Sequence, residues 1–218
     1  MKNLILEKLR KSWTVSERDT GEYHTLTGNG MNYTISAYRI AGLGSMSMIE
    51  MDAMAGMMRM ESFILTAEEK DLPLFNSDFI AAADNFTLLN EFYDTMIVPL
   101  APQMIAKYRA VKERFSEFPP YKTDPRWYDS IRYDFSFGGT GRNLKEMRDE
   151  IILAYMDAYL ENTAIAPKTD PVVKRAKTQQ YVDGLFSNGG AAVDHFKKLF
   201  GEEAAHEIFE RFVFSTRD

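Results

Sequence analysis

The chain has 218 residues, of which 45% are hydrophobic and 27% charged, an ordinary globular composition with enough length for a sizeable core. A net charge of -6, without a cluster of Lys and Arg, argues against a nucleic-acid-binding surface. The absence of cysteine excludes disulfides, thiolate nucleophiles and Cys-ligated metal sites, and it fits a reducing cytoplasm. No apolar run approaches the roughly 20 residues of a membrane span.

The first half of the chain is predicted to be rich in strands. Apolar residues spaced between charges over residues 3–13 indicate an amphipathic helix rather than a signal peptide. Alternating segments with glycine-containing turns between them predict strands over residues 22–27, 31–40, 46–52, 57–65, 77–83 and 86–92.

The second half is predicted to be rich in helices. Residues 95–115 have helical spacing, but Pro99 and Pro102 indicate that the regular part of this helix starts late. A loop over residues 118–125 precedes an alternating segment, 127–137, that predicts a strand. Further helices are expected over residues 143–160, 172–186 and 191–214.

Strands followed by helices are typical of the α+β class, in which helices cover an antiparallel sheet. We therefore expect a three-layer α/β/α sandwich with a central antiparallel sheet. No segment has the composition of a linker, so we expect residues 1–218 to form a single domain.

Methionine is unusually frequent, with 13 residues, of which seven lie between positions 46 and 60. Because methionine adapts to irregular space, these side chains could form the floor of a site for a large, flat, apolar ligand. The alternative is that they pack two strands against helices and have no further role.

Two acids are predicted to lie opposite each other on one hairpin. If the turn is centred on residues 55–56, Glu50 and Glu61 are cross-strand neighbours on the same face. Like charge and desolvation both raise a carboxyl pKa, and such an acid suits proton transfer. Asp78 follows in the next strand. The alternative is that all three are solvent-facing acids on half-buried strands.

Other motifs carry little functional signal. The glycine-rich segment 138–142 lacks the Walker lysine and the spacing of a dinucleotide-binding loop, so it is expected to be a turn. His24, His195 and His206 are scattered, and no pair has the spacing of a metal site. We therefore expect no metal.

Three segments in a shared order suggest a family. They are residues 61–78 with their Leu72-Pro73 turn and Asp78, residues 126–135 with Trp127, and the aromatic C-terminal segment 196–214. Over residues 46–214 the chain resembles the superfamily of ferredoxin-dependent bilin reductases and red chlorophyll catabolite reductase.

The resemblance implies reduction of a linear tetrapyrrole with no bound flavin, metal or nicotinamide. Electrons would come singly from an external partner, reduced ferredoxin or flavodoxin, and side-chain acids would protonate the ligand. Asp78 and Glu50 match acidic positions of the family, and Glu61 lies where one branch has a histidine. These three acids are the implied catalytic residues.

The resemblance also implies ligand contacts from Met48, Phe63 and Asn188, and Arg59 could pair with a propionate through its bidentate fork. Gly189 occupies the position of an aspartate in the family, so a second proton donor is missing there. We expect Glu50, Glu61 and Asp78 to line one cavity between the sheet and the C-terminal helices.

Two other functions remain open. The missing aspartate favours a non-catalytic tetrapyrrole-binding or chaperone protein on the same fold. A structural or interaction protein, whose methionine-rich face is only core, is the third reading of the residues.

Overall fold

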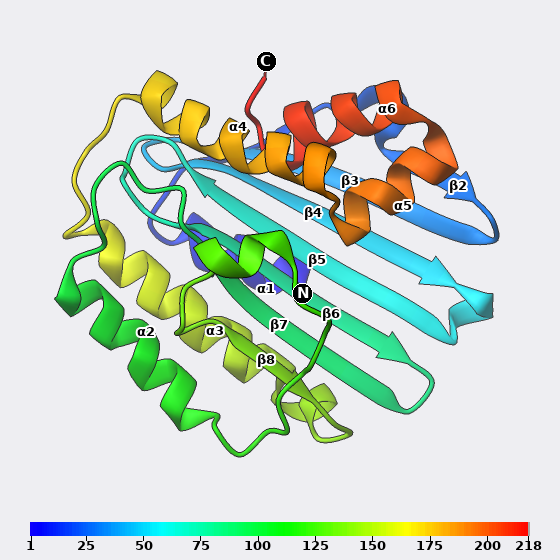
Figure 1. The fold of residues 1–218 in the computed structure, drawn as a ribbon, viewed down its shortest axis with the longest axis horizontal. Helices are drawn as coiled ribbons and strands as arrows, with labels where there is room; N and C mark the ends of the chain where they lie inside the picture. The colour runs from blue at the N-terminus through cyan, green and yellow to red at the C-terminus, as the bar shows by residue number, and fades with distance from the viewer. Residues whose placement is uncertain (218) are drawn as a thin grey trace.

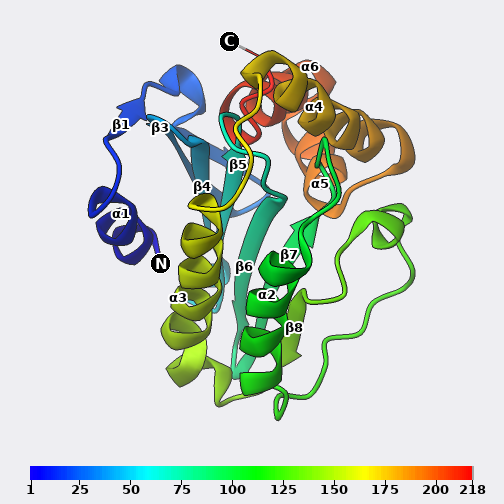
Figure 2. The same cartoon turned by 90° about the vertical axis from the view of Figure 1, so that its left-hand side faces the viewer.

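The computed structural model describes residues 1–217, and its centre is one antiparallel sheet with helices on both faces (Figure 1, Figure 2). Within these residues the sheet has eight strands: seven follow the order β1-β3-β4-β5-β6-β7-β8, and the eighth, β2, pairs with β3. The strands are β1 Val15–Arg18, β2 Thr25–Gly28, β3 Met31–Ile40, β4 Gly44–Ala53, β5 Met58–Ala67, β6 Leu74–Ala82, β7 Asn85–Tyr93 and β8 Phe137–Thr140. The expected α+β class with an antiparallel sheet is confirmed.

The helices follow the strands for the most part. The main ones are α1 Lys2–Arg10, α2 Pro102–Arg114, α3 Leu144–Thr163, α4 Pro171–Asn188, α5 Ala191–Phe200, α6 Glu202–His206 and the π-helical segment η4 Glu207–Val213. Pro102 is the first residue of α2, where its missing N–H costs nothing. The late start of this helix is therefore confirmed.

Two groups of helices cover opposite faces of the sheet. Helices α1, α2 and α3 pack on a core that includes Met48, Phe63 and Phe75, whereas α4, α5 and η4 pack on a core that includes Ile35 and Ile49. Figure 2 shows α1 and α3 on one side of the strands and the C-terminal helices on the other. Since successive side chains of a strand point to opposite faces, each strand contributes to both cores.

Four elements differ from the sequence prediction. The segment 127–137 is not a strand: residues Trp127–Ile131 form a 3-10 helix, in which the Asp129 carboxylate accepts a hydrogen bond from the Arg126 backbone N–H at 2.8 Å. The glycine-rich segment 138–142 was expected to be a turn, but its first three residues belong to strand β8. There Gly139 is required, because a Cβ would lie 2.7 Å from the Phe137 ring.

The predicted C-terminal helix 191–214 is divided into three pieces. Gly201 has φ +91°, a left-handed conformation that ends α5 before α6 begins. Strand β1 was not predicted, because its four residues are too few to show an alternating pattern.

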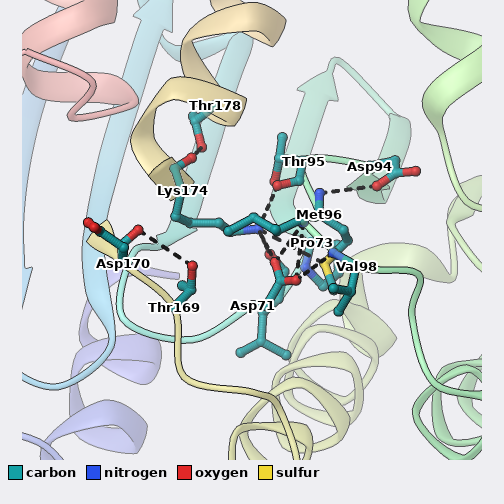
Figure 3. A network of polar contacts seen from close by, with 12 residues as sticks. Asp71, Pro73, Asp94, Thr95, Met96, Val98, Thr169, Asp170, Lys174 and Thr178 are labelled. Atoms are coloured by element: carbon teal, nitrogen blue, oxygen red, sulfur yellow. Dashed lines mark hydrogen bonds and ion pairs between the residues drawn. The ribbon is translucent and has the colours of Figure 1, made fainter. Parts of the chain in front are cut away.

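One buried ion pair joins α4 to the sheet (Figure 3). Lys174 Nζ lies 3.0 Å from the Asp71 carboxylate and donates to the carbonyl oxygens of Leu72 and Thr95 at 2.7 and 2.6 Å. Asp71 also accepts hydrogen bonds from the backbone N–H groups of Ile97 and Val98. Burial lowers the pKa of Lys174. This network attaches the first turn of α4 to the loop before β6 and to the loop after β7.

No helix within residues 1–217 combines the length and apolar character that crossing a bilayer would demand.

Candidate functional site

A large cavity lies between the sheet and the C-terminal helices. Its volume is about 1200 Å³, above the ~300–1000 Å³ of typical small-molecule sites. The sheet face from β3 to β7 forms its floor, and side chains of α4, α5 and η4 form one wall. The irregular segment between α2 and β8 forms the other wall and includes Tyr121 and Tyr128. The cavity therefore suits a ligand that is larger than most metabolites and mainly apolar.

Asp78 is the acid on the floor of this cavity. It lies on β6, directly opposite Ser62 of β5. Ser62 Oγ donates a hydrogen bond to Asp78 Oδ1 at 2.5 Å, and Asn76 Nδ2 donates to Oδ2 at 2.7 Å. Both donors are neutral, and both come from the same sheet face, so the carboxyl group is held by the rigid part of the fold.

Burial raises the pKa of Asp78 to about 6, with a smaller contribution in the same direction from the negative charge of Glu91. The two hydrogen bonds stabilise the carboxylate and act in the opposite direction. A ligand that filled the cavity would displace more water, which favours the neutral acid further. Asp78 is thus suited to hold a proton near neutral pH and to release it to a base in the cavity.

A second acid of the cavity has a different environment. Glu91 of β7 accepts a hydrogen bond from Arg132 Nη1 at 2.7 Å and one from the Tyr93 hydroxyl at 2.8 Å. Tyr93 in turn stacks on Tyr181 of α4, with ring centroids 4.9 Å apart. Because Glu91 is neutralised by an arginine and Asp78 is not hydrogen-bonded to a cation, the two carboxyl groups suit different tasks.

At the other end of the floor, Tyr33 and His195 form a close polar pair. The Tyr33 hydroxyl lies 2.6 Å from His195 Nε2 and 3.2 Å from the sulfur of Met31. Tyr33 comes from β3 and His195 from α5, and both line the cavity. Burial raises the pKa of Tyr33, so its hydroxyl stays protonated at neutral pH.

The predicted register of the two glutamates is confirmed, because Glu50 and Glu61 are direct partners in the β4–β5 ladder. The prediction that they share a cavity with Asp78 is wrong. Asp78 is paired with Ser62, so Glu61 and Asp78 point to opposite faces of the sheet. Glu61 instead binds the N-terminal amine of Met1 at 2.7 Å and Arg148 of α3 at 2.9 Å.

The implied ligand contacts on β4 and β5 also lie on the wrong face. Met48 and Phe63 are fully buried in the core under α1 and α3. Arg59 pairs with Asp52 at 3.1 Å near the hairpin turn and does not line the cavity. Asn188 is exposed at the end of α4 and is not part of the cavity wall either.

Sequence reasoning missed several residues that the structure brings to the cavity, among them Tyr33, Glu91, Arg132 and His195. The sequence could have indicated Tyr33. It lies two positions after Met31 in the correctly predicted strand 31–40, so the two side chains point to the same face. His195 carried no local signal, because its partner is 162 residues away.

The methionines were expected either to form the floor of a ligand site or to pack the core, and the structure shows some of them in each place. Met31, Met51, Met58 and Met60 line the cavity at the Tyr33 end, whereas Met46 and Met48 belong to the opposite core. Neither reading of the methionines covers all of them, because alternation along the strands distributes them over both faces.

Comparison with known proteins finds a likeness in fold. The sequence matches no protein-family model and no curated protein. Among solved structures, the chain is similar to phytochromobilin synthase from tomato, which was crystallised in complex with biliverdin. The TM-score is 0.78 at 14% identity, and the match covers 99% of this chain and 83% of that one. The likeness shows that the two chains share a fold.

Proposed function

We propose that this protein binds a linear tetrapyrrole in the cavity and reduces it with single electrons from reduced ferredoxin, while Asp78 supplies a proton. The observation that carries the proposal is a carboxyl group, with a pKa raised to about 6, on the floor of a cavity of about 1200 Å³. The fold similarity to a protein crystallised with biliverdin supports the choice of ligand. We take the sheet and its two helical groups as the layers of an α/β/α sandwich of the same kind.

The cavity wall matches the two parts of such a ligand. Aromatic and methionine side chains offer apolar contact to a flat conjugated system. Arg126 and Lys122 lie in the irregular wall and are exposed, so they can meet the carboxylates of two propionate side chains. This assignment replaces Arg59, which lies on the opposite face.

Asp78 has a clear chemical task in this proposal. Addition of one electron to a conjugated tetrapyrrole makes it more basic, so a nearby neutral acid can protonate it. The O–H bond of Asp78 breaks, a new bond to hydrogen forms on the ligand, and the carboxylate remains on Ser62 and Asn76. The carboxylate then regains a proton from water. No flavin or metal takes part in this step.

The Asp78→Asn variant tests the assignment. It keeps the size and a hydrogen-bond acceptor but cannot donate an acidic proton. We expect biliverdin binding close to that of the wild type and reduction slower by about 10²- to 10⁴-fold. The measurement is anaerobic turnover of biliverdin with a reduced ferredoxin system, followed by absorbance.

Equal rates for the wild type and Asp78→Asn would overturn the assignment of the proton donor. Binding of biliverdin without any reduction by the wild type would favour the non-catalytic tetrapyrrole-binding function. Glu61→Gln is the matched control, because it removes a carboxylate from the same sheet on the face away from the cavity.

A further inference from the structure

The cavity holds one acid with a raised pKa on its floor, Asp78, yet reduction of a tetrapyrrole by two electrons takes up two protons. Glu91 is already engaged, because its two carboxylate oxygens accept hydrogen bonds from Arg132 and from the Tyr93 hydroxyl. The source of the second proton must therefore be sought elsewhere in the cavity.

We propose that Tyr33 is a second proton donor to the ligand and that His195 positions and recharges its hydroxyl. This inference rests on the proposed function. It follows from the 2.6 Å contact between Tyr33 Oη and His195 Nε2, two residues that both line the cavity. Among the residues that the structure describes, the other hydrogen bond of this pair runs from the Tyr33 hydroxyl to the Met31 sulfur, which is a weak acceptor.

The pair lies at the end of the floor remote from Asp78. The ladder aligns Tyr33 with Met51, Met60 and Ile80, so three strand spacings and two residues separate Tyr33 from Asp78. The corresponding distance between their Cα atoms is roughly 16 Å. This span matches an extended conjugated ligand that contacts both groups, Asp78 near its middle and Tyr33 at a terminal ring.

The ring of Tyr33 packs against two phenylalanine rings. Its centroid lies 5.1 Å from Phe196 and 5.8 Å from Phe200, both in edge-to-face geometry. The side chain lines the cavity and is only 2% exposed. A group fixed in this way can donate a proton without loss of further conformational freedom.

The two-electron reduction of the ligand is balanced when a one-electron donor of the iron–sulfur class supplies both electrons. Two electrons from the donor and two protons from the protein convert the ligand into a product with two more hydrogens. Asp78 gives the first proton after the first electron. After the second electron, the Tyr33 O–H bond breaks and a second bond to hydrogen forms on the ligand.

His195 returns a proton to the tyrosine. Its Nε2–H bond breaks as the proton moves to the phenolate oxygen, and Nδ1 takes up a proton from water. The ring thus changes tautomer and stays neutral. His195 is partly exposed on α5, which gives it contact with solvent. It acts through Tyr33 and is a positioning residue rather than a group that touches the ligand.

The test follows the radical that forms between the two proton transfers. Wild type, Tyr33→Phe, His195→Phe and His195→Gln are each loaded with biliverdin and supplied anaerobically with reduced ferredoxin. Absorbance titration gives binding, electron paramagnetic resonance gives the radical, and absorbance gives the final product. Tyr38→Phe is the matched control, since it removes a hydroxyl from the same strand on the opposite face.

We expect Tyr33→Phe to bind biliverdin within a few-fold of the wild type and to form the radical. Conversion of the radical to product should slow by about 10²-fold or more, so that the radical accumulates. His195→Phe should behave in the same way, and His195→Gln should recover part of the rate because it keeps an N–H donor. A purely structural role would not move the radical population.

Normal conversion of the radical by Tyr33→Phe, or by His195→Phe, would overturn the inference and leave the proposed function intact. Failure of the wild type to bind biliverdin would overturn both, and this outcome is distinct because it appears before any variant is compared. Since His195 lies at a partly exposed site, its two variants keep the test valid if Tyr33→Phe folds poorly.

Discussion

The acids that the sequence analysis singles out lie on opposite faces of the sheet. Asp78 lies in the cavity, whereas Glu61 joins the N-terminal amine of Met1 to Arg148 of α3. Alternation predicted the Glu50–Glu61 register, because the hairpin between them is short. It could not relate Glu61 to Asp78, because the irregular connection from 68 to 73 between β5 and β6 resets the alternation.

A pH dependence of stability is expected from Asp78. Its pKa is about 6 in the folded protein and 3.8 as its ordinary value, so the folded state binds more protons than the unfolded state between these pH values. The contribution of this group to stability is therefore present in acid and is lost as the pH rises through 6. Asp78→Asn should be more stable than the wild type at pH 7.5, by about 2 kcal/mol, and similar at pH 4.

Urea unfolding of both proteins at the two pH values measures this difference. A stability difference that does not change with pH would show that Asp78 titrates like an ordinary exposed aspartate.

Glu61 is expected to act in stability rather than in ligand chemistry. Glu61→Gln removes the charge that pairs with the Met1 amine and Arg148, and both pairs are partly buried. We expect a loss of about 1 kcal/mol in the free energy of unfolding and unchanged biliverdin affinity. A tenfold weaker affinity, measured by absorbance titration, would contradict the placement of Glu61 away from the cavity.

At the scale of elements, the ion pair between Lys174 and Asp71 holds α4 on two loops of the sheet (Figure 3). The two side chains are 1% and 2% exposed, so removal of one partner leaves a buried charge. Lys174→Met should cost about 3–5 kcal/mol in the free energy of unfolding. Lys177→Met, on the same helix but partly exposed, should change it by less than about 0.5 kcal/mol.

Denaturant unfolding of both variants gives these values. Adding Asp71→Asn to Lys174→Met should restore part of the loss, because the unpaired carboxylate is then absent. Equal stability of the two single lysine variants would show that the buried pair contributes nothing.

Helix α4 also contacts the irregular wall of the cavity at one glycine. A Cβ on Gly184 would clash with the ring of Trp127, whose indole N–H donates to the Gly189 carbonyl at 2.8 Å. Gly184→Ala should therefore lose about 1–3 kcal/mol, although alanine favours helix by about 1 kcal/mol. Ser187→Ala on the same helix is the control. A stabilised Gly184→Ala protein, measured by urea unfolding, would show that Trp127 moves without cost.

The sequence predicted the elements best where they were long and regular. The strand 31–40 was predicted with its observed bounds, and the long helix near 143–160 is present as Leu144–Thr163. The prediction of a strand over residues 127–137 was wrong, because an alternating pattern cannot show that the Asp129 side chain caps a turn there. The cavity residues were largely missed, since contacts such as Tyr33–His195 join β3 to α5 and depend on the tertiary fold.

At the scale of the whole molecule, the sheet separates a face with a filled core from a face with a cavity. The core under α1, α2 and α3 is filled with aromatic rings, whereas the opposite face keeps a cavity of about 1200 Å³. Figure 2 shows the C-terminal helices over that second face. Binding of the ligand should therefore depend on residues of this face and on no residue of the first.

Absorbance titration with biliverdin tests this claim most directly, with wild type compared to Ala192→Trp and Glu61→Gln. Ala192 is an exposed residue of α5 at the cavity wall, so a tryptophan there can enter the cavity without disturbing the core. We predict saturable binding with a shifted spectrum for the wild type and for Glu61→Gln, and at least tenfold weaker binding for Ala192→Trp. No saturable binding by the wild type, or equal binding by all three proteins, would contradict the account.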